Sequence, residues 1–432
     1  MIGLGLAGFA ALIALVALGL PIGLVMMVVG FVGLVLVGNI DTALTQLTSA
    51  FWSEGSKFVL IALPFYVLMG NLIYHTGIAR NLYRAASHWL GWLPGGLGIA
   101  SVFASAGFGA VSGSSTATAR TMGAIVIPEM RRHGYGMRLA TGVLSSAGTL
   151  GILIPPSIIL IFYGLLTETS IGKLFVAGIV PGLIIATIFS ILIMVISLID
   201  PEQGGRHLAS DRAPLRERIA SLAHVFPVLA IFGVIFGGLY NGVFTPTEGA
   251  IFGVVAVLIY GAATGSLSFA AIRNSFADAA LVTVMLFVII VGGTLVTRFL
   301  AQTGFTGTLR DLIQSMELGY VGFIFAVTIL YLVLGCVLDT FGMLILTVPI
   351  LFPLAQQLGI DPVWFGIYAV IVTEVGLVTP PIGVNVYVIK TVAPDVPLGQ
   401  IFLGCTPFVL GLLAFVALMA AEPSIILWLV GP

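Results

Sequence analysis

Long apolar runs, almost free of charged residues, make up most of this chain. A helix needs about 20 such residues to cross a bilayer, so the 432 residues allow about ten to twelve crossings. Only 8% of the side chains are charged, against about a quarter in a soluble domain, which is too few to cover a water-soluble surface. The net charge of −1 gives no basic field for nucleic acid. We therefore exclude a cytosolic enzyme and a nucleic-acid-binding protein and predict an all-α integral membrane protein.

Besides the apolar runs, three segments mix polar and apolar residues at helical spacing, and we expect these segments to lie along the membrane surface. These segments are 41–53, 77–90 and 265–278. One long polar stretch, 201–221, divides the chain almost in half and is expected to be a linker. The apolar runs are 2–20, 22–38, 57–75, 97–112, 116–130, 137–166, 174–199, 222–241, 248–263, 279–300, 319–338, 343–357, 363–389 and 400–420.

The two halves of the chain resemble each other at an offset of 225 positions. Gly and Pro residues coincide at five places without a gap, which indicates an internal repeat rather than chance in a Gly-rich chain. The coincidences pair Pro128 with Pro353, Gly134 with Gly359, Gly151 with Gly376, and Pro155-Pro156 with Pro380-Pro381.

The basic residues give an orientation, because Lys and Arg collect in short cytoplasmic loops. If the linker is cytoplasmic and each half has five crossings and one re-entrant hairpin, eleven of the sixteen basic residues lie on the cytoplasmic side of the membrane. Both termini are then periplasmic, and the halves are inverted repeats, 1–200 and 222–432. The first repeat would contain helices 2–38 and 174–199, arm 41–53, hairpin 97–130 and interrupted helix 137–166; the second, helices 222–263 and 400–420, arm 265–278, hairpin 319–357 and interrupted helix 363–389.

Two polar breaks interrupt the apolar runs of the first repeat. Residues 112–116 (SGSST) could present oxygens to a hard cation at the tip of a hairpin, or could form a polar helix–helix contact. Residues 148–151 (GTLG) precede Pro155-Pro156. A Pro pair ends a helix and frees carbonyl groups, although a simple kink is the alternative. In transporters built from inverted repeats, paired breaks of this kind mark substrate and ion sites.

The second repeat has two corresponding breaks, and each carries an acid. Asp339 begins DTFG at the second hairpin tip, where it could serve a functional site or cap a helix. Glu374 precedes Gly376, Thr379 and the second Pro pair. Either carboxylate could bind a cation, carry a proton or fix a hairpin.

One arginine lies next to the first break. Arg120 is one turn past Thr116 on the same helix face. It could hold a substrate carboxylate in a bidentate pair, or it could form a structural ion pair or extend its charge to the membrane surface. The sequence has no GxSxG, no P-loop and no zinc-ligand spacing, so any active transport would have to use an ion gradient.

These motifs together resemble a known family. GAVSGSSTATA (109–119), IPEMRRHGY (127–135), GTLGILIPPS (148–157) and VTEVGLVTPPIGVNVYV (372–388) are similar to the large, DctM-type membrane subunit of tripartite ATP-independent periplasmic (TRAP) transporters. The likeness extends over essentially the whole chain. Arg120 departs from it, since a small residue is expected there.

The resemblance implies a function, a mechanism and partners. Such proteins are elevator-type secondary transporters of the bacterial inner membrane that import organic acids, such as C4-dicarboxylates or sialic acid, with Na⁺. They work with a small four-helix membrane subunit and a soluble periplasmic binding protein. Both hairpins and both interrupted helices would move against a scaffold containing 2–38, 174–199, 222–263 and 400–420, with arms 41–53 and 265–278.

The resemblance also implies site residues. Our own inference is the pairing of tips with breaks: one Na⁺ site would join the first tip to the break near Gly376 and Thr379, and the other would join the second tip to the break near Gly148 and Gly151. By resemblance the expected substrate residues are Thr116, Thr379 and Asn385, to which we add Arg120 because of its own position one turn past Thr116. The expected Na⁺ residues are Ser112, Ser114, Ser115, Thr149, Gly151, Asp339, Thr340, Thr373, Gly376 and Thr379.

Three alternatives stay open at this point. A stand-alone divalent-anion/Na⁺ symporter would take up its substrate without a binding protein. A channel would conduct passively rather than show saturable uptake. An intramembrane enzyme would depend on Asp339 for catalysis.

Overall fold

The computed structural model describes residues 1–205, 214–315, 318–336 and 338–431, and these residues form helices and no strand. Residues 206–213 of the expected linker and residue 337 of the second hairpin lie outside the described part. The first half contains α1 (Ile2–Ala17), α2 (Ile22–Val37), α3 (Ile40–Gly55), η1 (Phe58–Ile61), α4 (Ala62–His75), α5 (Ile78–Leu90), α6 (Gly96–Ser112), α7 (Ser115–Arg132), α8 (Met137–Ala147), α9 (Leu150–Leu153), α10 (Ile158–Thr167), α11 (Ile171–Ile199) and α12 (Pro201–Gly204). The second half contains α13 (Leu215–Tyr240), α14 (Pro246–Thr264), α15 (Phe269–Gln302), α16 (Phe305–Ser315), α17 (Tyr320–Leu334), α18 (Thr340–Gln357), α19 (Pro362–Val378), α20 (Val384–Val392), α21 (Leu398–Ala421) and α22 (Ser424–Leu427).

The helix bounds recur at the same offset of 225. Helix α7 spans 115–132 and α18 spans 340–357, while the start of α8 and the end of α9 match the bounds of α19. The Pro pairs lie in the breaks after α9 and α19, at residues 154–157 and 379–383. Proline donates no backbone hydrogen bond and restricts the residue before it, and the two helices end two residues before their Pro pairs, at Leu153 and Val378.

The first part of the second repeat differs from the prediction. We predicted an arm at 265–278 separate from an apolar helix at 279–300, but α15 is one continuous helix of 34 residues. In the first repeat α3 ends at Gly55, and Ser56 and Lys57 separate it from η1 and α4, whereas the equivalent positions 280–282 are Ala, Leu and Val. These residues do not interrupt a helix. In addition, α13 begins at Leu215, inside the expected linker, and the sequence analysis did not predict α16.

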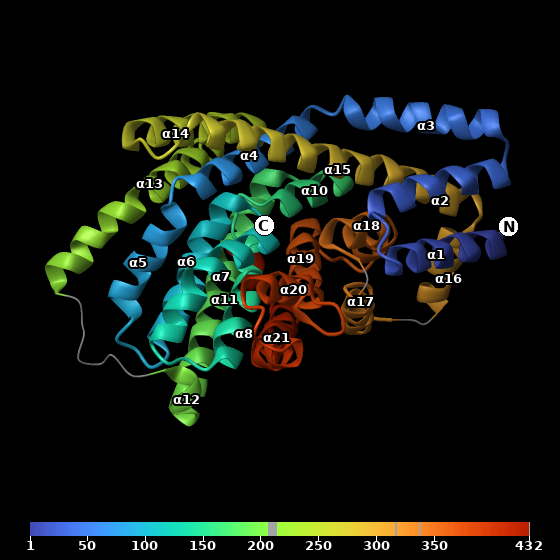
Figure 1. Cartoon of the computed structure of the whole chain (residues 1–432). Coiled ribbons are helices and arrows are strands. Elements are labelled where there is room, and N and C mark those ends of the chain that lie inside the picture. The colour runs from blue at the N-terminus through green and yellow to red at the C-terminus, as the bar shows by residue number, and fades with distance from the viewer. Residues whose placement is uncertain (206–213, 316–317, 337, 432) are drawn as a thin grey trace.

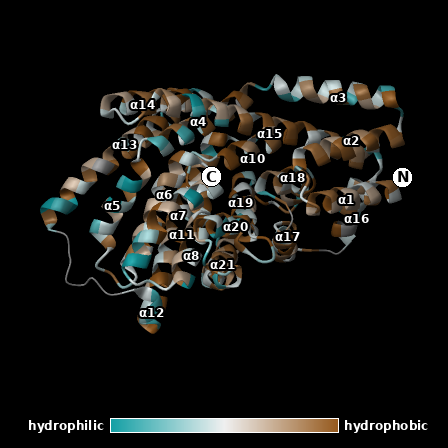
Figure 2. Cartoon of the chain, viewed as in Figure 1, coloured by the Kyte–Doolittle hydropathy of each residue, from teal (hydrophilic) through white to brown (hydrophobic). Residues whose placement is uncertain are grey.

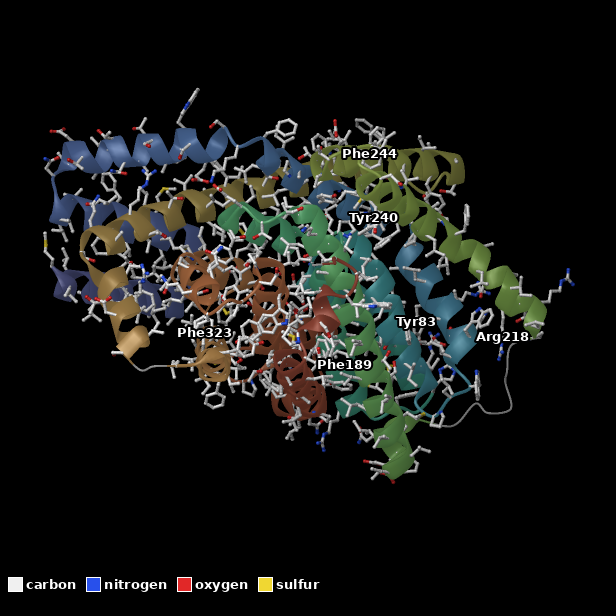
Figure 3. The ribbon with its side chains drawn as sticks, turned by 180° about the vertical axis from the view of Figure 1, so that it is seen from behind. Tyr83, Phe189, Arg218, Tyr240, Phe244 and Phe323 are labelled. Atoms are coloured by element: carbon white, nitrogen blue, oxygen red, sulfur yellow. The ribbon has the colours of Figure 1, made fainter. Side chains whose placement is uncertain are left out.

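Three helices lie in a layer across one side of a helical bundle. Figure 1 shows α3, α14 and α15 along the upper edge, with α6–α11 and α17–α21 below them. Aromatic contacts hold the bundle together: Phe189 on α11 and Phe408 on α21 meet edge to face with ring centroids 5.1 Å apart, and Figure 3 shows Phe189 and Phe323 among the packed side chains.

Apolar side chains also cover much of the outside. Five described helices are long and apolar enough to cross a membrane, or seven if each of two bent helix pairs counts as one span. One bent pair is Met137–Leu153 with Ile158–Thr167, at 46°. Figure 2 shows most helices in brown, with more polar residues along α3. Exposed apolar helix faces of this extent fit a lipid environment.

Candidate functional site

A cavity of about 660 Å³ lies between the two hairpin tips. A cavity of this size suits a small molecule. One wall is the first tip, Ser112–Thr116, with Arg120 one turn further on. Asp339, Thr340 and Phe341 bring the second tip to the same cavity. The opposite wall comes from α4 and α15 and includes four polar residues, Asn71, His75, Asn274 and Asp278.

The first tip is a tight turn between α6 and α7. Gly113 has φ +62°, a conformation that glycine adopts without a steric penalty. Ser114 then caps α7, because its hydroxyl accepts the backbone N–H of Ala117 at 3.3 Å. The hydroxyls of Ser112 and Thr118 are 2.9 Å apart inside the turn. The sequence therefore folds here into a compact cluster of hydroxyl and carbonyl oxygens.

This tip rests on the break in its own repeat. A Cβ placed on Gly151 would lie 2.9 Å from the carbonyl oxygen of Ser114 and 2.6 Å from the Thr118 hydroxyl. A Cβ on Gly148 would lie 3.0 Å from the carbonyl oxygen of Ser115. Glycine is needed at 151, since real Cβ atoms essentially never come so close to a backbone oxygen, and a Cβ at 148 would be unusually tight.

The first tip also reaches the second repeat. The Ser115 hydroxyl donates to Oε2 of Glu374 at 2.8 Å and accepts from Nδ2 of Asn385 at 2.7 Å. Glu374 is 2% exposed and Asn385 is fully buried. We refer to Ser115, Glu374 and Asn385 as the Ser115 bridge. It joins α7 to α19 and α20 across the two repeats.

The second tip has a simpler geometry. Asp339 caps α18 by accepting the backbone N–H of Gly342 at 3.1 Å. The ring of Phe341 meets Phe162 on α10 edge to face, with centroids 5.2 Å apart. Just before this tip, Gly335 packs on Gly376, where a Cβ on Gly376 would lie 3.0 Å from the Gly335 Cα.

These contacts bear on the expected pairing of tips and breaks. We expected the first tip to meet the break near Gly376, and its Ser115 does reach that break through Glu374 and Asn385. Each tip region also packs on the break of its own repeat, the first tip on Gly148 and Gly151 and the segment before the second tip on Gly376, which we did not expect. The pairing of tips and breaks as Na⁺ sites stays a prediction.

The other expected site residues lie around the breaks. The hydroxyls of Thr149, Thr373 and Thr379 donate to carbonyl oxygens three or four residues earlier in their own helices. Thr379 and Asn385, expected at the substrate, are not among the residues that line the cavity, whereas Thr116 and Arg120 are. The sequence analysis missed the wall from α4 and α15, because its polar residues are scattered singly among apolar ones.

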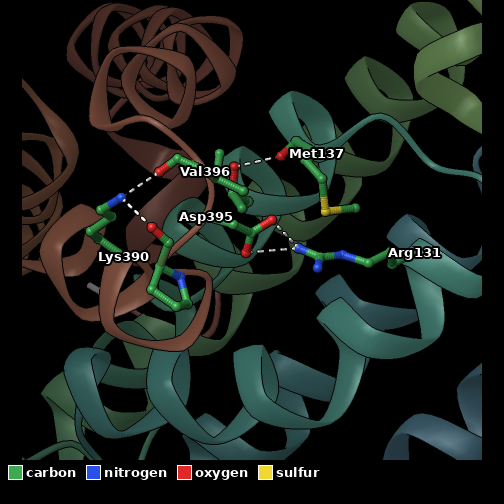
Figure 4. A network of polar contacts seen from close by, with 7 residues as sticks. Arg131, Met137, Lys390, Asp395 and Val396 are labelled. Carbon is green, nitrogen blue, oxygen red and sulfur yellow. Dashed lines mark hydrogen bonds and ion pairs between the residues drawn. The ribbon is translucent and has the colours of Figure 1, made fainter.

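Helices α7 and α20 run side by side from the Ser115 bridge to the cytoplasmic ends predicted for them. Midway along, a Cβ on Gly123 would lie 2.8 Å from Cδ1 of Ile389. At the far end Arg131 donates to both carboxylate oxygens of Asp395, at 2.8 and 3.1 Å, as Figure 4 shows. The hydrogen bond from Arg131 holds the pKa of Asp395 below its usual value. Lys390 donates to the carbonyl oxygens of Pro394 and Val396 and closes the same loop.

Comparison with known proteins decides the family. Residues 9–425 match the family model of the tripartite ATP-independent periplasmic transporter, DctM component. The chain belongs to the DctM family of TRAP transporters. It is 35% identical to the C4-dicarboxylate TRAP transporter large permease protein DctM of Pseudomonas aeruginosa, over 87% of this chain and 86% of the relative. It is 31% identical to the sialic acid TRAP transporter large permease protein SiaM of Vibrio cholerae, over 95% of each.

A solved structure has a similar fold. The YdaH transporter of Alcanivorax borkumensis superposes with a TM-score of 0.62 at 15% identity and covers 91% of this chain and 90% of its own. This DctM-family chain is thus an all-α, multi-pass inner-membrane protein with a role in TRAP transport, as the sequence predicted.

Proposed function

We propose that this DctM-family permease imports a small organic acid together with Na⁺, and that the substrate binds in the cavity between the tips. The observation that carries the proposal is the convergence of both tips and Arg120 on one cavity of about 660 Å³. Arg120 is exposed on the cavity, where its guanidinium can pair with a carboxylate in a bidentate geometry. Helices α7 and α18 both begin at this cavity, and their N-termini attract an anion.

We propose that Na⁺ binds at the tips as a second substrate. Hard cations prefer oxygen ligands, and the first tip offers the Ser112 and Thr118 hydroxyls and the Ser114 carbonyl beside Gly151. The second tip offers the Asp339 carboxylate and the Thr340 hydroxyl. A cation at either tip would order the turn and place positive charge beside the anion, so the two would bind cooperatively.

We propose an elevator motion in which the tips and breaks move as one body against α4 and α15. The closest backbone contacts, at which an added Cβ would lie no more than 2.5 Å from a carbonyl oxygen, guide which helices we assign to this body. A Cβ on Gly404 of α21 would lie 2.0 Å from the Arg138 carbonyl oxygen on α8, and a Cβ on Gly178 of α11 would lie 2.5 Å from the Leu153 carbonyl oxygen. Surfaces packed this tightly cannot slide past each other. We therefore move 174–199 and 400–420 from the expected scaffold to the mobile body.

The proposed partners follow from the family, whose name denotes three components. A periplasmic binding protein would deliver the acid to the cavity, and a small membrane subunit would cover part of the apolar exterior. The chain alone should then bind Na⁺ but not sustain uptake. Uptake by this chain alone in liposomes would favour the stand-alone symporter.

The first experiment is a thermal-stability titration of the detergent-solubilised chain in NaCl, KCl and choline chloride. A ligand at about 100 times its dissociation constant stabilises a protein by about 2.7 kcal/mol, so a Na⁺ site should give a rise specific to NaCl. Succinate or N-acetylneuraminate should then add stability in NaCl but not in KCl. Equal curves in the three salts would refute Na⁺ coupling and favour the channel or enzyme alternatives.

A further inference from the structure

We infer that Glu374 is a positioning residue: through Ser115 it fixes the first tip to the end of α19, so that the tip is held ready for Na⁺. The inference rests on the proposed function. It assigns Ser115 a different role from the one expected from the sequence, in which its hydroxyl is a ligand of the ion.

The hydrogen bonds of Ser115 carry the first step. A serine hydroxyl has one hydrogen and two lone pairs. Its hydrogen is donated to Glu374 at 2.8 Å, and one lone pair accepts from Asn385 at 2.7 Å. Asn385 also donates to the carbonyl oxygen of Ser145 at 3.3 Å and is thereby held against α8. The hydrogen and one of the two lone pairs of the Ser115 hydroxyl are thus committed to protein groups, while the hydroxyls of its neighbours Ser112 and Ser114 stay at the turn.

The place of Ser115 in the tip gives the second step. Ser115 is the first residue of α7, and its own carbonyl oxygen faces Gly148 while that of Ser114 faces Gly151. A bond that fixes the Ser115 side chain therefore also fixes the backbone oxygens on either side of the tip–break contact. Glu374 lies at the N-terminal end of α7, where a carboxylate is favoured by the helix dipole.

The packing of α19 gives the third step. Two residues beyond Glu374, Gly376 lies in backbone contact with Gly335, just before the second tip. The last turns of α19 are therefore held between the two tips, with Glu374 bound to one and Gly376 packed on the other. The three residues of the bridge are at most 4% exposed, so water competes only weakly for its bonds.

The test uses the fact that an amide oxygen can accept the same hydrogen bond as a carboxylate. The probe is NaCl, titrated against KCl in thermal melts of the full chain. Glu374→Ala should raise the half-saturating Na⁺ concentration at least about tenfold, because it removes a hydrogen bond to a carboxylate. Glu374→Gln should stay within about threefold of wild type. Tyr368→Phe is the matched control: it removes a buried hydroxyl on the same helix, bonded at 2.8 Å to the Ile324 carbonyl oxygen, far along α19 from either tip.

A double-mutant cycle tests whether Glu374 acts through Ser115. Ser115→Ala should weaken Na⁺ binding, and adding it to Glu374→Ala should cause little further loss, since both remove one contact. A Gln variant as impaired as the Ala variant would overturn the inference and assign Glu374 a role that needs its charge. An Ala variant with wild-type Na⁺ dependence, or additive losses, would overturn it as well.

The outcomes separate the inference from the proposed function. Absence of any Na⁺-specific stabilisation in wild type refutes the function, whatever the variants do. In that case the double-mutant cycle is measured by melting temperatures in KCl. Additive losses of melting temperature would still overturn the inference that Glu374 acts through Ser115, and coupled losses would still support it.

Discussion

Replacing Gly151 by alanine tests the contact between the first tip and its break. A Cβ at this position would lie 2.6 Å from the Thr118 hydroxyl and 2.9 Å from the Ser114 carbonyl oxygen. The backbone of Gly151 is not in the left-handed region, so the alanine is harmful only through this overlap. Thr118 cannot turn away freely, because it is 2.9 Å from the Ser112 hydroxyl. The tip must therefore move from the break.

The size of the effect follows from the cost of overpacking. An extra methyl group in a well-packed core costs about 1–3 kcal/mol. If Na⁺ needs the tip in contact with the break, this cost is added to the binding free energy. At about 1.4 kcal/mol per tenfold change, the half-saturating Na⁺ concentration should rise roughly 5- to 150-fold.

The assay is the melting temperature in detergent as a function of NaCl, with KCl making up constant ionic strength. Gly399→Ala on α21 is the matched control, because a Cβ there meets nothing within 4 Å, and it should keep the wild-type titration. The reasoning is refuted if Gly151→Ala gives a folded protein whose half-saturating Na⁺ concentration is within about twofold of wild type.

Three more predictions concern other parts of the molecule. Gly404→Ala should lower the melting temperature in every salt and the free energy of unfolding by about 1–3 kcal/mol, because its Cβ would meet the Arg138 carbonyl oxygen at 2.0 Å; a wild-type melt would show that α8 and α21 can separate. Arg120→Ala should abolish the stabilisation by succinate or N-acetylneuraminate while leaving that by Na⁺; an unchanged response to both acids would remove Arg120 from the binding residues. Thr245→Ala should cost about 1 kcal/mol at neutral pH, because it breaks the capping box with Glu248 at the start of α14. Thermal melts of the variant and of wild type at neutral pH measure this cost, and equal melting temperatures would refute the role of the cap.

The sequence predicted the helices of the second half best where they repeat those of the first. Helix α18 begins and ends 225 residues after α7, and both Pro pairs could be located in breaks because proline acts locally. The continuity of α15 could not be seen from the polar residues at 265–278, which resemble those of α3. Comparing positions 280–282 with 55–57 would have shown that the interrupting Gly-Ser-Lys is absent. The same comparison would have predicted α16, because it occupies the positions equivalent to those of α5 in the first repeat.

The candidate site was predicted only in part, because composition marks the tips but not their contacts. Hydroxyl residues and Asp339 mark the two tips by composition alone, and the structure brings both tips to one cavity. Which tip meets which break depends on contacts between distant residues, and one sequence carries no such information. Glu374 was recognised as an unusual acid, but its contact with Ser115 required the fold.

The long reach of the Ser115 bridge has a consequence for the biosynthesis of the chain. Ser115 is separated from Glu374 by 259 positions and from Asn385 by 270. At about 5–20 residues per second, a ribosome needs roughly 15 to 50 s to synthesise that interval. During this time the nascent first tip lacks the two side chains that complete the Ser115 bridge. The last third of the chain must therefore insert before the first third reaches its final structure, and a chain truncated before Glu374 would present an incomplete tip to membrane quality control.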